Sequence, residues 1–537
     1  MKLNNLVFDF DQFASEMANL KNLKHFDYLV TIIGEDFGEE GLGCIYILEN
    51  TDTHERTSVK MIARTQVCGD GQASNGTGDT DGQMTAYIPT VSDLWKSADL
   101  LEREVYDFLG IVFIGHPDMR RLFLRSDFKG YPLRKDFKAD DKYTLEDDVE
   151  PDYGLEYYFD KNGYLQCKQN PLFGDDAYVV NIGPQHPSTH GVLRLQTVLD
   201  GETVKRIYPH LGYIHRGIEK MWESMTYPQT LALTDRLNYL SAMMHRHALV
   251  GVIEEAMGIE LTDRIKTIRT IMDELQRLDS HLLYCGCTAQ DLGALTAFLY
   301  CMRDREHVLN VMEETTGGRL IQNYYRIGGL QDDIDPNFVK NVKDLCTYLR
   351  PMIQEYMDVF GDNVITHNRL EKVGTMNLED CINYGVTGPA GRAAGWKNDV
   401  RKTHPYDMYD KVEWKQITLT GCDSMDRYLV HIQEMYQSLD IIEQLIEKGI
   451  PEGDFYVKQK PIIKVPEGQW YFSVEGASGE FGVYLDSKGD KSPYRMKMRP
   501  MGLTLIGALD AMLREQKIAD LVATTAAIDV VIPDIDR

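Results

Sequence analysis

Apolar side chains recur at steps of three and four residues in three long segments of the second half of the chain. The first segment runs from Thr262 to Tyr284, and the same spacing returns over residues 342–356 and 429–445. This period gathers the apolar side chains on one face of an α-helix, which must be buried against other elements. The run from Leu292 to Met302 is almost entirely apolar but too short to span a bilayer, so it predicts a buried helix. We therefore expect a helical bundle in this half.

Short strand patterns precede these helices. The segments YVVNIG, from Tyr178, and VLRLQTVLDGETVKRIY, from Val192, read as short strands. Asp200-Gly201 divides the second segment and predicts a hairpin with a type I′ turn. Residues 1–137 mix alternating apolar runs with short helical patterns, which predicts an α/β domain. A small β-sheet is therefore expected beside the bundle, and an α/β domain before it.

Acidic residues crowd between Asp140 and Asp160, where nine of them occur without amphipathic spacing. Such a composition is typical of a solvated linker. We therefore predict an α+β chain of two domains: an α/β domain over residues 1–138, an acidic linker over 139–175, and a mainly α-helical domain with a small β-sheet over 176–537. The Gly/Asp/Asn-rich segment 68–83 predicts a surface loop.

The overall charge narrows the range of partners. Lys and Arg number 57 against 83 Asp and Glu, a net charge of −26, which disfavours binding to nucleic acid. No apolar run reaches the roughly 18–20 residues of a membrane-spanning helix. The nine cysteines form no CxxC pair and phosphate-binding glycine motifs are absent, so we expect no metal, cluster or nucleotide on this chain. We expect a cytoplasmic protein, or one that reaches a membrane only through partners.

Seven of the fourteen histidines lie between residues 181 and 281. His186 and His190 occur in GPQHPSTHG, where glycine and proline impose a turn rather than a helix. Because no further ligand lies nearby in the sequence, a metal site is disfavoured. Either both side chains bond the backbone of a tight loop, or one projects into a cavity as a proton carrier, since imidazole titrates near physiological pH.

Two further polar side chains are candidates. Tyr239, in TDRLNYLSAMMHRH, is predicted to lie on a helix, and Asp291 is predicted to open the apolar helix of QDLGALTAFLYC. An aspartate in such a position is ordinarily an N-cap, and a helical tyrosine ordinarily belongs to the core. From the residues alone, the structural and the catalytic interpretations both stay open.

Several long motifs resemble one family. Similarity to the C subunit of the proton-pumping NADH–quinone oxidoreductase, respiratory complex I, is carried by LEREVYDFLGIVFIGHPDMRRLFLRSDFKGYPLRKDF, which starts at Leu101. Similarity to the D subunit is carried by VNIGPQHPSTHGVLRLQ, HLGYIHRGIEK, QDLGALTAF, GVTGPAGRAAGWKNDVRK, SPYRMKMRP and the closing DIDR. The chain thus resembles a fused C/D subunit of this family.

The resemblance implies a fold and a reaction. The D-like part would be similar to the large subunit of nickel–iron hydrogenases, without the metal. In the family, residues at the positions of His190 and Tyr239 contact the quinone headgroup, and an aspartate at the position of Asp291 partners the histidine. We add His186 to the quinone-binding set, and Arg216 matches a position near the terminal iron–sulfur cluster of a partner. The implied reaction is reduction of quinone to quinol with proton donation from Tyr239 and His190, coupled to proton translocation.

The resemblance also implies partners, because this chain has no cluster ligands of its own. They would be an iron–sulfur subunit bearing the terminal cluster, an FMN-bearing module and membrane-embedded subunits, with this chain held peripherally at the cytoplasmic face of the inner membrane. Ferredoxin or another donor in place of NADH, and a non-catalytic structural subunit, stay open. A nickel hydrogenase is disfavoured, because its two CxxC pairs are missing. Many relatives carry a histidine where this chain has Thr288.

Overall fold

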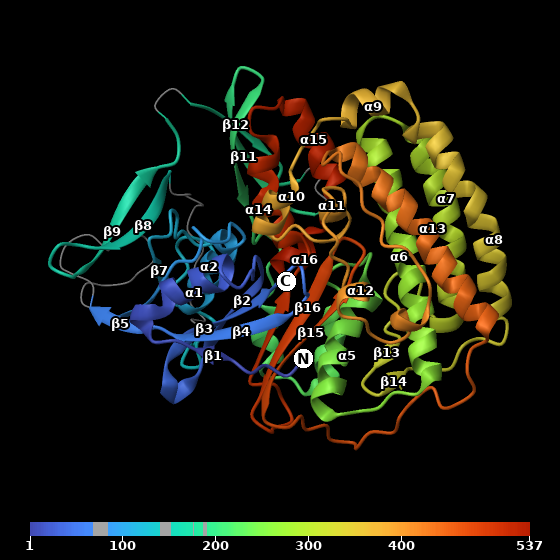
Figure 1. Cartoon of the computed structure of the whole chain (residues 1–537), viewed down its shortest axis with the longest axis horizontal. Coiled ribbons are helices and arrows are strands. Elements are labelled where there is room, and N and C mark those ends of the chain that lie inside the picture. Colours follow the sequence, from blue (N-terminus) through green and yellow to red (C-terminus); the bar gives the residue numbers. More distant parts are fainter. Residues whose placement is uncertain (68–83, 140–151, 175–176, 186–190) are drawn as a thin grey trace.

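The computed structural model describes residues 1–67, 84–139, 152–174, 177–185 and 191–537 (Figure 1). The predicted surface loop over 68–83 lies outside the described residues, as do His186 and His190. Within the described ranges, no helix combines the length and the apolar character needed to cross a lipid bilayer.

Long helices form the predicted bundle, at the right of Figure 1: α5 (Ala242–Met257), α6 (Asp263–Asp291), α7 (Leu295–Thr316), α8 (Phe338–Tyr356) and α13 (Ser424–Lys448). Helix α6 packs against α7, α13 and α5. Its apolar stripe is buried, at 0–1% exposure: Ile265, Ile268, Met272, Leu275, Leu278 and Leu282. The three helices predicted from apolar spacing are confirmed.

The buried helix predicted over Leu292 to Met302 is wrong in two respects. The helix α7 starts at Leu295, three residues later than the apolar run, and it continues to Thr316. Its first turns are only half covered, because Leu295 is 57% exposed and Leu299 is 55% exposed. The helix formed by this apolar run therefore has one face that other described parts of the chain do not cover.

The predicted strands after residue 177 are present. β10 (Tyr178–Ile182), β11 (Arg194–Asp200) and β12 (Thr203–His210) form an antiparallel sheet in that order. Asp200 pairs with Thr203, so Gly201 and Glu202 form the turn. Of these two, only Gly201 has a positive φ, at +61°. The hairpin is confirmed, but a type I′ turn is not formed, since that turn needs positive φ at both central residues.

A second three-stranded sheet, not predicted from the sequence, lies between the bundle and the N-terminal part (Figure 1). It consists of β15 (Gly468–Glu475), β16 (Glu480–Ser487) and β17 (Arg495–Arg499), paired antiparallel in that order. Every residue of β16 is buried. Because both faces of this strand are covered, its sequence lacks the alternation that marks a half-exposed strand.

Among its described residues, the N-terminal part contains two small sheets and two α-helices, in agreement with the predicted α/β composition. One sheet has the order β1 (Leu6–Val7), β4 (Arg56–Ile62), β3 (Leu42–Glu49) and β2 (Tyr28–Asp36). The other has the order β5 (Arg64–Val67), β6 (Met84–Pro89) and β7 (Ile111–Ile114), and the helices are α1 (Phe13–Asn22) and α2 (Ala98–Leu109).

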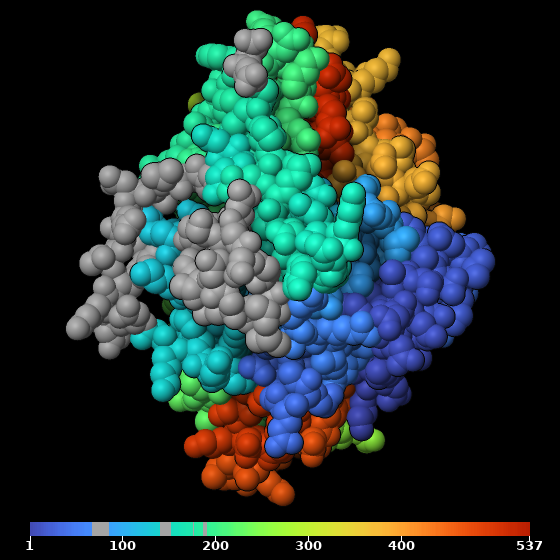
Figure 2. Space-filling view, turned by 90° about the vertical axis from the view of Figure 1, so that its left-hand side faces the viewer, coloured from blue at the N-terminus to red at the C-terminus, as the bar shows by residue number. Residues whose placement is uncertain are grey.

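A β-hairpin occupies much of the range predicted to be an acidic linker. Its strands are β8 (Tyr153–Phe159) and β9 (Leu165–Pro171), and they bury Leu155 and Leu165 to 5% and 1% exposure. This part of the range is therefore regular structure with buried side chains rather than an extended linker. Figure 2 views this side of the molecule, where the hairpin (teal) lies against the N-terminal part (blue). The domain limits themselves remain a prediction.

The N-terminal part and the rest of the chain share a core. Leu29 of β2, Leu195 of β11 and Leu505 of α14 (Gly502–Leu513) belong to the same apolar cluster. The Tyr484 hydroxyl of β16 donates to the buried carboxylate of Glu35 on β2 at 2.8 Å. The remaining described elements are short: η1 (Phe10–Gln12), η2 (Gly38–Glu40), α3 (Ile218–Trp222), α4 (Tyr227–Thr234), β13 (Tyr325–Arg326), β14 (Gly329–Leu330), η4 (Met357–Gly361), α9 (Val364–Leu370), α10 (Leu378–Tyr384), α11 (Gly388–Arg392), α12 (Val400–Thr403), η5 (Tyr409–Lys411), α15 (Ile518–Ala527) and α16 (Ile532–Asp536).

Candidate functional site

Tyr239 lies in a turn between two helices and not on a helix as predicted. Helix α4 ends at Thr234, and α5 begins at Ala242. The side chain of Asn238 accepts a hydrogen bond from the N–H of Leu240 at 2.9 Å, and Nδ1 of His245 accepts one from the N–H of Asn238 at 3.4 Å. These side-chain bonds replace helical backbone bonds, which explains the break in the helix.

Contacts from elsewhere in the chain fix the backbone on both sides of Tyr239. Gln276 of α6 donates from its side-chain amide to the carbonyl of Leu240 at 3.0 Å. The N–H of Ala477, in the connection between β15 and β16, donates to the hydroxyl of Ser241 at 3.4 Å. The position of the phenol is therefore determined by the bundle and by the central sheet together.

Arg216 is exposed but attached to the same turn. One guanidinium nitrogen donates to the carbonyl of Arg236 at 3.0 Å, three residues before Tyr239. Its own N–H donates to the carbonyl of Arg537, the last residue of the chain, at 3.4 Å. Arg216 is thus a fixed surface cation beside the turn, and its location near the cluster of a partner stays a prediction.

The Tyr239 phenol is partly buried, and burial raises its pKa. Cys287 and Asp529 raise this pKa further, while the positive charge of Arg305 opposes them. A phenol with a raised pKa keeps its proton at neutral pH and gives it up only to a strong base.

The Tyr239 hydroxyl differs from other tyrosines of the helical part in its hydrogen bonding. Tyr409 donates to Glu274 at 2.6 Å, and Tyr356 donates to Asp304 at 2.6 Å. Within the ranges that the structure describes, the Tyr239 hydroxyl makes no hydrogen bond to protein. A half-buried phenol without such a partner can donate to a ligand.

Asp291 is the last residue of α6 and does not open the next helix, so the predicted N-cap role is wrong. Cys287 lies one turn before it on the same helix. Burial raises the pKa of the Cys287 thiol to about 11, with Asp291 and Asp529 as the next causes. Cys287 is thus an electrostatic neighbour of both Asp291 and Tyr239, and so the end of α6 and the Tyr239 turn face one region.

A second carboxylate, missed from the sequence, lies deeper on α6. Asp279 is fully buried, and burial raises its pKa to about 6 although Arg305 of α7 opposes the shift. The two charged groups approach to 2.8 Å, and Asp279 also accepts from Gln276, the residue that holds the Tyr239 turn, at 3.0 Å. Its only sequence signal is an acidic residue inside an otherwise apolar helical face.

The described residues on either side of the segment 186–190, which contains His186 and His190, are held near the C-terminus. Gln185 and Val192 form an antiparallel bridge at its base. Gly191 packs directly on α16, because a Cβ there would come within 2.7 Å of Ile532. The two histidines lie outside the described residues, and so their predicted contacts with Asp291 and quinone remain predictions.

A network of buried charges, also missed from the sequence, fills the interior of the bundle. Arg392 of α11 bonds Glu434 of α13 and Glu475 of β15, each at 2.6 Å. Glu434 also lies 3.2 Å from Nε2 of His281 on α6. Each of these groups is paired, and such pairing is what allows charge to remain in an interior. Arg392 occurs in the motif GVTGPAGRAAGWKNDVRK, but its partners are distant in sequence.

The described thiols and carboxylates form no metal site. No group of three or more His, Cys, Asp and Glu side chains with suitable geometry occurs within the described part. None of the described cysteines forms a disulfide with another described cysteine, and burial raises the pKa of both Cys285 and Cys287. Thiols with raised pKa values stay protonated, whereas metals bind thiolates.

Comparisons with known proteins assign the family. The model of the respiratory-chain NADH dehydrogenase 49 Kd subunit matches residues 291–464 and 455–537, and that of the 30 Kd subunit matches residues 6–143. The chain is 53% identical to the fused C/D subunit of the NADH-quinone oxidoreductase of Phocaeicola vulgatus over 98% of each chain. It is 52% identical to the C/D subunit of Bacteroides thetaiotaomicron over 97% of each chain.

A separate D subunit, which is shorter than this chain, also matches. The separate D subunit of the NADH-quinone oxidoreductase of Geobacter sulfurreducens is 40% identical over 99% of its own length and 67% of this chain. Such a D-type relative therefore matches only part of a chain whose full length is matched by fused C/D relatives. The chain belongs to the family of fused C/D subunits of NADH-quinone oxidoreductase, and it is a subunit of that oxidoreductase complex.

Proposed function

We propose that Tyr239 and His190 bind the quinone headgroup and donate protons to it, with His186 beside them. The cavity would form between this chain and a partner that carries the terminal iron–sulfur cluster. The observation that carries the proposal is the Tyr239 hydroxyl, which is partly buried, is held by a fixed backbone and bonds no described residue. The family position of this residue supports the same role.

The chemistry of quinone reduction suits these residue types. Conversion to quinol takes two electrons and two protons, and each carbonyl oxygen becomes an O–H. Tyr239 donates a hydrogen bond to one oxygen and transfers its proton only when that oxygen becomes strongly basic, because burial raises the pKa of the phenol. His190 supplies the second proton, and Asp291 orients its imidazole and stabilises the protonated form.

Electrons would arrive from the partner's cluster, fed by an FMN-bearing module that oxidises NADH. Arg216 would lie near that cluster, where a fixed positive charge raises the reduction potential. Proton translocation would be coupled through membrane-embedded partners. This chain would be bound peripherally, at the cytoplasmic face of the inner membrane. We also propose that the bundle shares the fold of the nickel–iron hydrogenase large subunit without its metal.

The substitution Tyr239→Phe tests the role of the hydroxyl. We expect quinone reductase activity of the assembled complex to fall by about 100-fold or more, the usual effect of removing a proton donor. Stability should change by less than about 0.5 kcal/mol, because no described residue accepts from this hydroxyl. Electron transfer from NADH to an artificial acceptor upstream of quinone should stay unchanged.

The matched control is Tyr436→Phe, which removes a hydroxyl from a partly buried tyrosine of α13 away from the turn. It should leave both activities intact. Normal quinone reduction in the Tyr239 variant would contradict the proposed role and would favour a structural subunit. An equal loss in both variants would show that the assay reports folding rather than proton donation.

A further inference from the structure

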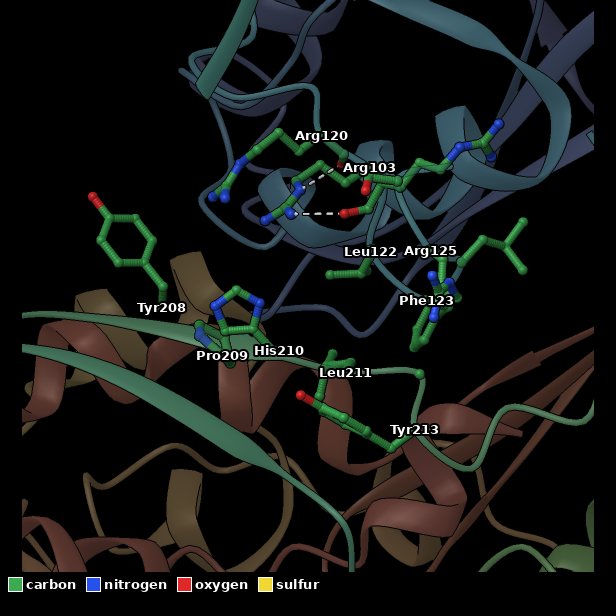
Figure 3. Close-up of a pocket in the computed structure, with 14 residues that line it drawn as sticks. Arg103, Arg120, Leu122, Phe123, Arg125, Tyr208, Pro209, His210, Leu211 and Tyr213 are labelled. Carbon is green, nitrogen blue, oxygen red and sulfur yellow. Dashed lines mark hydrogen bonds between the residues drawn. The ribbon is translucent and has the colours of Figure 1, made fainter. Parts of the chain in front are cut away.

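A cavity of about 310 Å³ lies where the N-terminal part meets strand β12, far in sequence from the Tyr239 turn (Figure 3). Its upper wall comes from Arg103 of α2 and the segment 120–126, and its lower wall from residues 208–213. The volume is at the lower end of the range typical of small-molecule sites. Four of the described residues that line the cavity are arginines, although the chain as a whole is strongly acidic.

The arginine charges in this wall outnumber the carboxylate charges that face them. Arg103 donates to the carbonyls of Arg120 and Arg121 at 3.1 and 3.2 Å, and no carboxylate of the described part forms an ion pair with it. Arg120 binds both oxygens of Asp118, at 2.7 and 3.0 Å. Although burial opposes ionisation, Arg103 and Arg120 lower the pKa of Asp118 to about 2. Asp118 is therefore shared by two guanidinium groups, and Asp99, the other carboxylate that interacts with Arg103, is itself paired with His116 at 3.4 Å.

Arg121 does not change the excess of positive charge at the cavity. It forms an ion pair with Asp107 at 3.0 Å, and Asp107 also accepts from the backbone N–H groups of Leu122, Phe123 and Leu124. Asp107 is fully buried on the far side of the segment and does not line the cavity. The Asp107 carboxylate is therefore already bound by Arg121 and these N–H groups, and it does not neutralise Arg103.

His210, on the opposite wall, responds to the same positive field. Burial, and then the charges of Arg194, Arg120 and Arg103, lower the pKa of its imidazole to about 3. The ring is therefore neutral at physiological pH, with Nε2 at 3.0 Å from the side-chain oxygen of Gln196. Three arginines, from α2, the segment 120–126 and strand β11, thus act on the same imidazole at the cavity.

We propose that this cavity binds an oxyanion of the phosphate class, either free or carried by a small molecule, with Arg103 and Arg120 as its principal ligands. Guanidinium groups present several N–H donors in one plane, which suits phosphate oxygens, and a buried anion needs such charged donors. The bound anion would neutralise Arg103 and join α2 to β12. Nothing in this proposal depends on the quinone reaction.

The test uses the purified full-length chain and inorganic phosphate, at constant ionic strength set with chloride. Calorimetric titration should give one phosphate per chain, and phosphate should raise the unfolding temperature. Arg103→Gln should weaken binding by about tenfold or more, because a charged hydrogen-bonding group is lost. Arg103→Lys, which keeps the charge, should bind more tightly than Arg103→Gln.

Arg206→Gln is the matched control. Arg206 is an exposed arginine of β12 that does not line this cavity, so the same change in net charge should leave phosphate binding intact. A short alkyl phosphate in place of phosphate distinguishes the sources: tighter binding of the ester assigns a phosphorylated small molecule, and tighter binding of phosphate assigns the free ion.

A measurement on the unmodified chain tests the proposal even if the variants fail to fold. Phosphate should protect Arg103 and Arg120 of the unmodified chain from an arginine-specific dicarbonyl reagent, as read by mass spectrometry, and should not protect Arg206. The absence of stoichiometric binding, equal loss in Arg103→Gln and Arg206→Gln, or equal protection of all three arginines would overturn the proposal.

Discussion

The middle of helix α6 and the Tyr239 turn, which lies beside the C-terminal end of that helix, differ in how their polar side chains are paired. In the middle, Glu274 accepts from Arg401 at 3.0 Å, from Tyr409 at 2.6 Å and from Ser438 at 2.6 Å. Near the end, the Tyr239 hydroxyl bonds no described residue. Fully paired groups hold a structure together, whereas a positioned group without a protein partner is free to act on a ligand.

The same contrast separates two sets of arginines. Arg392 and Arg401 are fully buried and bound by carboxylates within the bundle. Arg103, at the cavity between α2 and β12, has only backbone carbonyls as described acceptors. Pairing, rather than residue type or burial alone, therefore distinguishes Arg392 and Arg401, which we regard as structural, from Arg103, which we assign to binding.

The largest expected effect of breaking a paired group is on stability. Glu274→Gln leaves Arg277 without its carboxylate and weakens the bonds to Arg401, so unfolding free energy should fall by about 3–5 kcal/mol. Unfolding by a chemical denaturant measures this change in free energy. The control Glu313→Gln breaks an exposed pair with Arg319 and should cost no more than about 1 kcal/mol. Similar losses in both variants would contradict the distinction between paired interior and exposed charges.

A smaller effect is expected from titration of a paired histidine. His247 is buried between Asp273 at 2.7 Å and Asp407 at 3.2 Å. Burial lowers its pKa, but the two carboxylates outweigh burial and raise the pKa to about 9. Since the folded pKa exceeds the unfolded value of about 6.5, the pair stabilises the fold fully below pH 6.5 and loses this contribution as the pH rises toward 9.

The variant His247→Gln exposes this dependence. The difference in unfolding free energy between the native chain and the variant should be largest near pH 6. It should shrink by about 3 kcal/mol as the pH rises above 9. Chemical unfolding at a series of pH values measures the difference, and a difference independent of pH would show that the fold does not raise the pKa of His247.

The helices could be predicted from the sequence because burial of one face leaves a direct period in the residues. The sheet of β15 to β17 could not, since strand β16 is covered on both faces and has no alternation. The break at Tyr239 does have a local signal, because Asn238 is a residue type whose side chain bonds nearby backbone, here the N–H of Leu240.

Local sequence patterns do not predict which charged side chains form ion pairs. Arg392 meets Glu434 and Glu475, which are 42 and 83 residues away in the chain. The arginine-lined cavity likewise joins α2 to β12. Only tertiary structure brings such groups together, so sequence periodicity contains no information about which charges are paired. Family resemblance pointed to Tyr239, Asp291 and Arg216 but said nothing of Asp279 or Arg103.

The most direct test of the account is photolabelling of the assembled complex with a quinone analogue that carries a photoreactive group on its headgroup ring. Mass spectrometry would then locate the labelled residues. We predict label on the turn of residues 235–241 and at the end of α6 near Asp291, and loss of that label when excess quinone competes. Competable label confined to other parts of this chain or to partner subunits would contradict the assignment of Tyr239 to the quinone site.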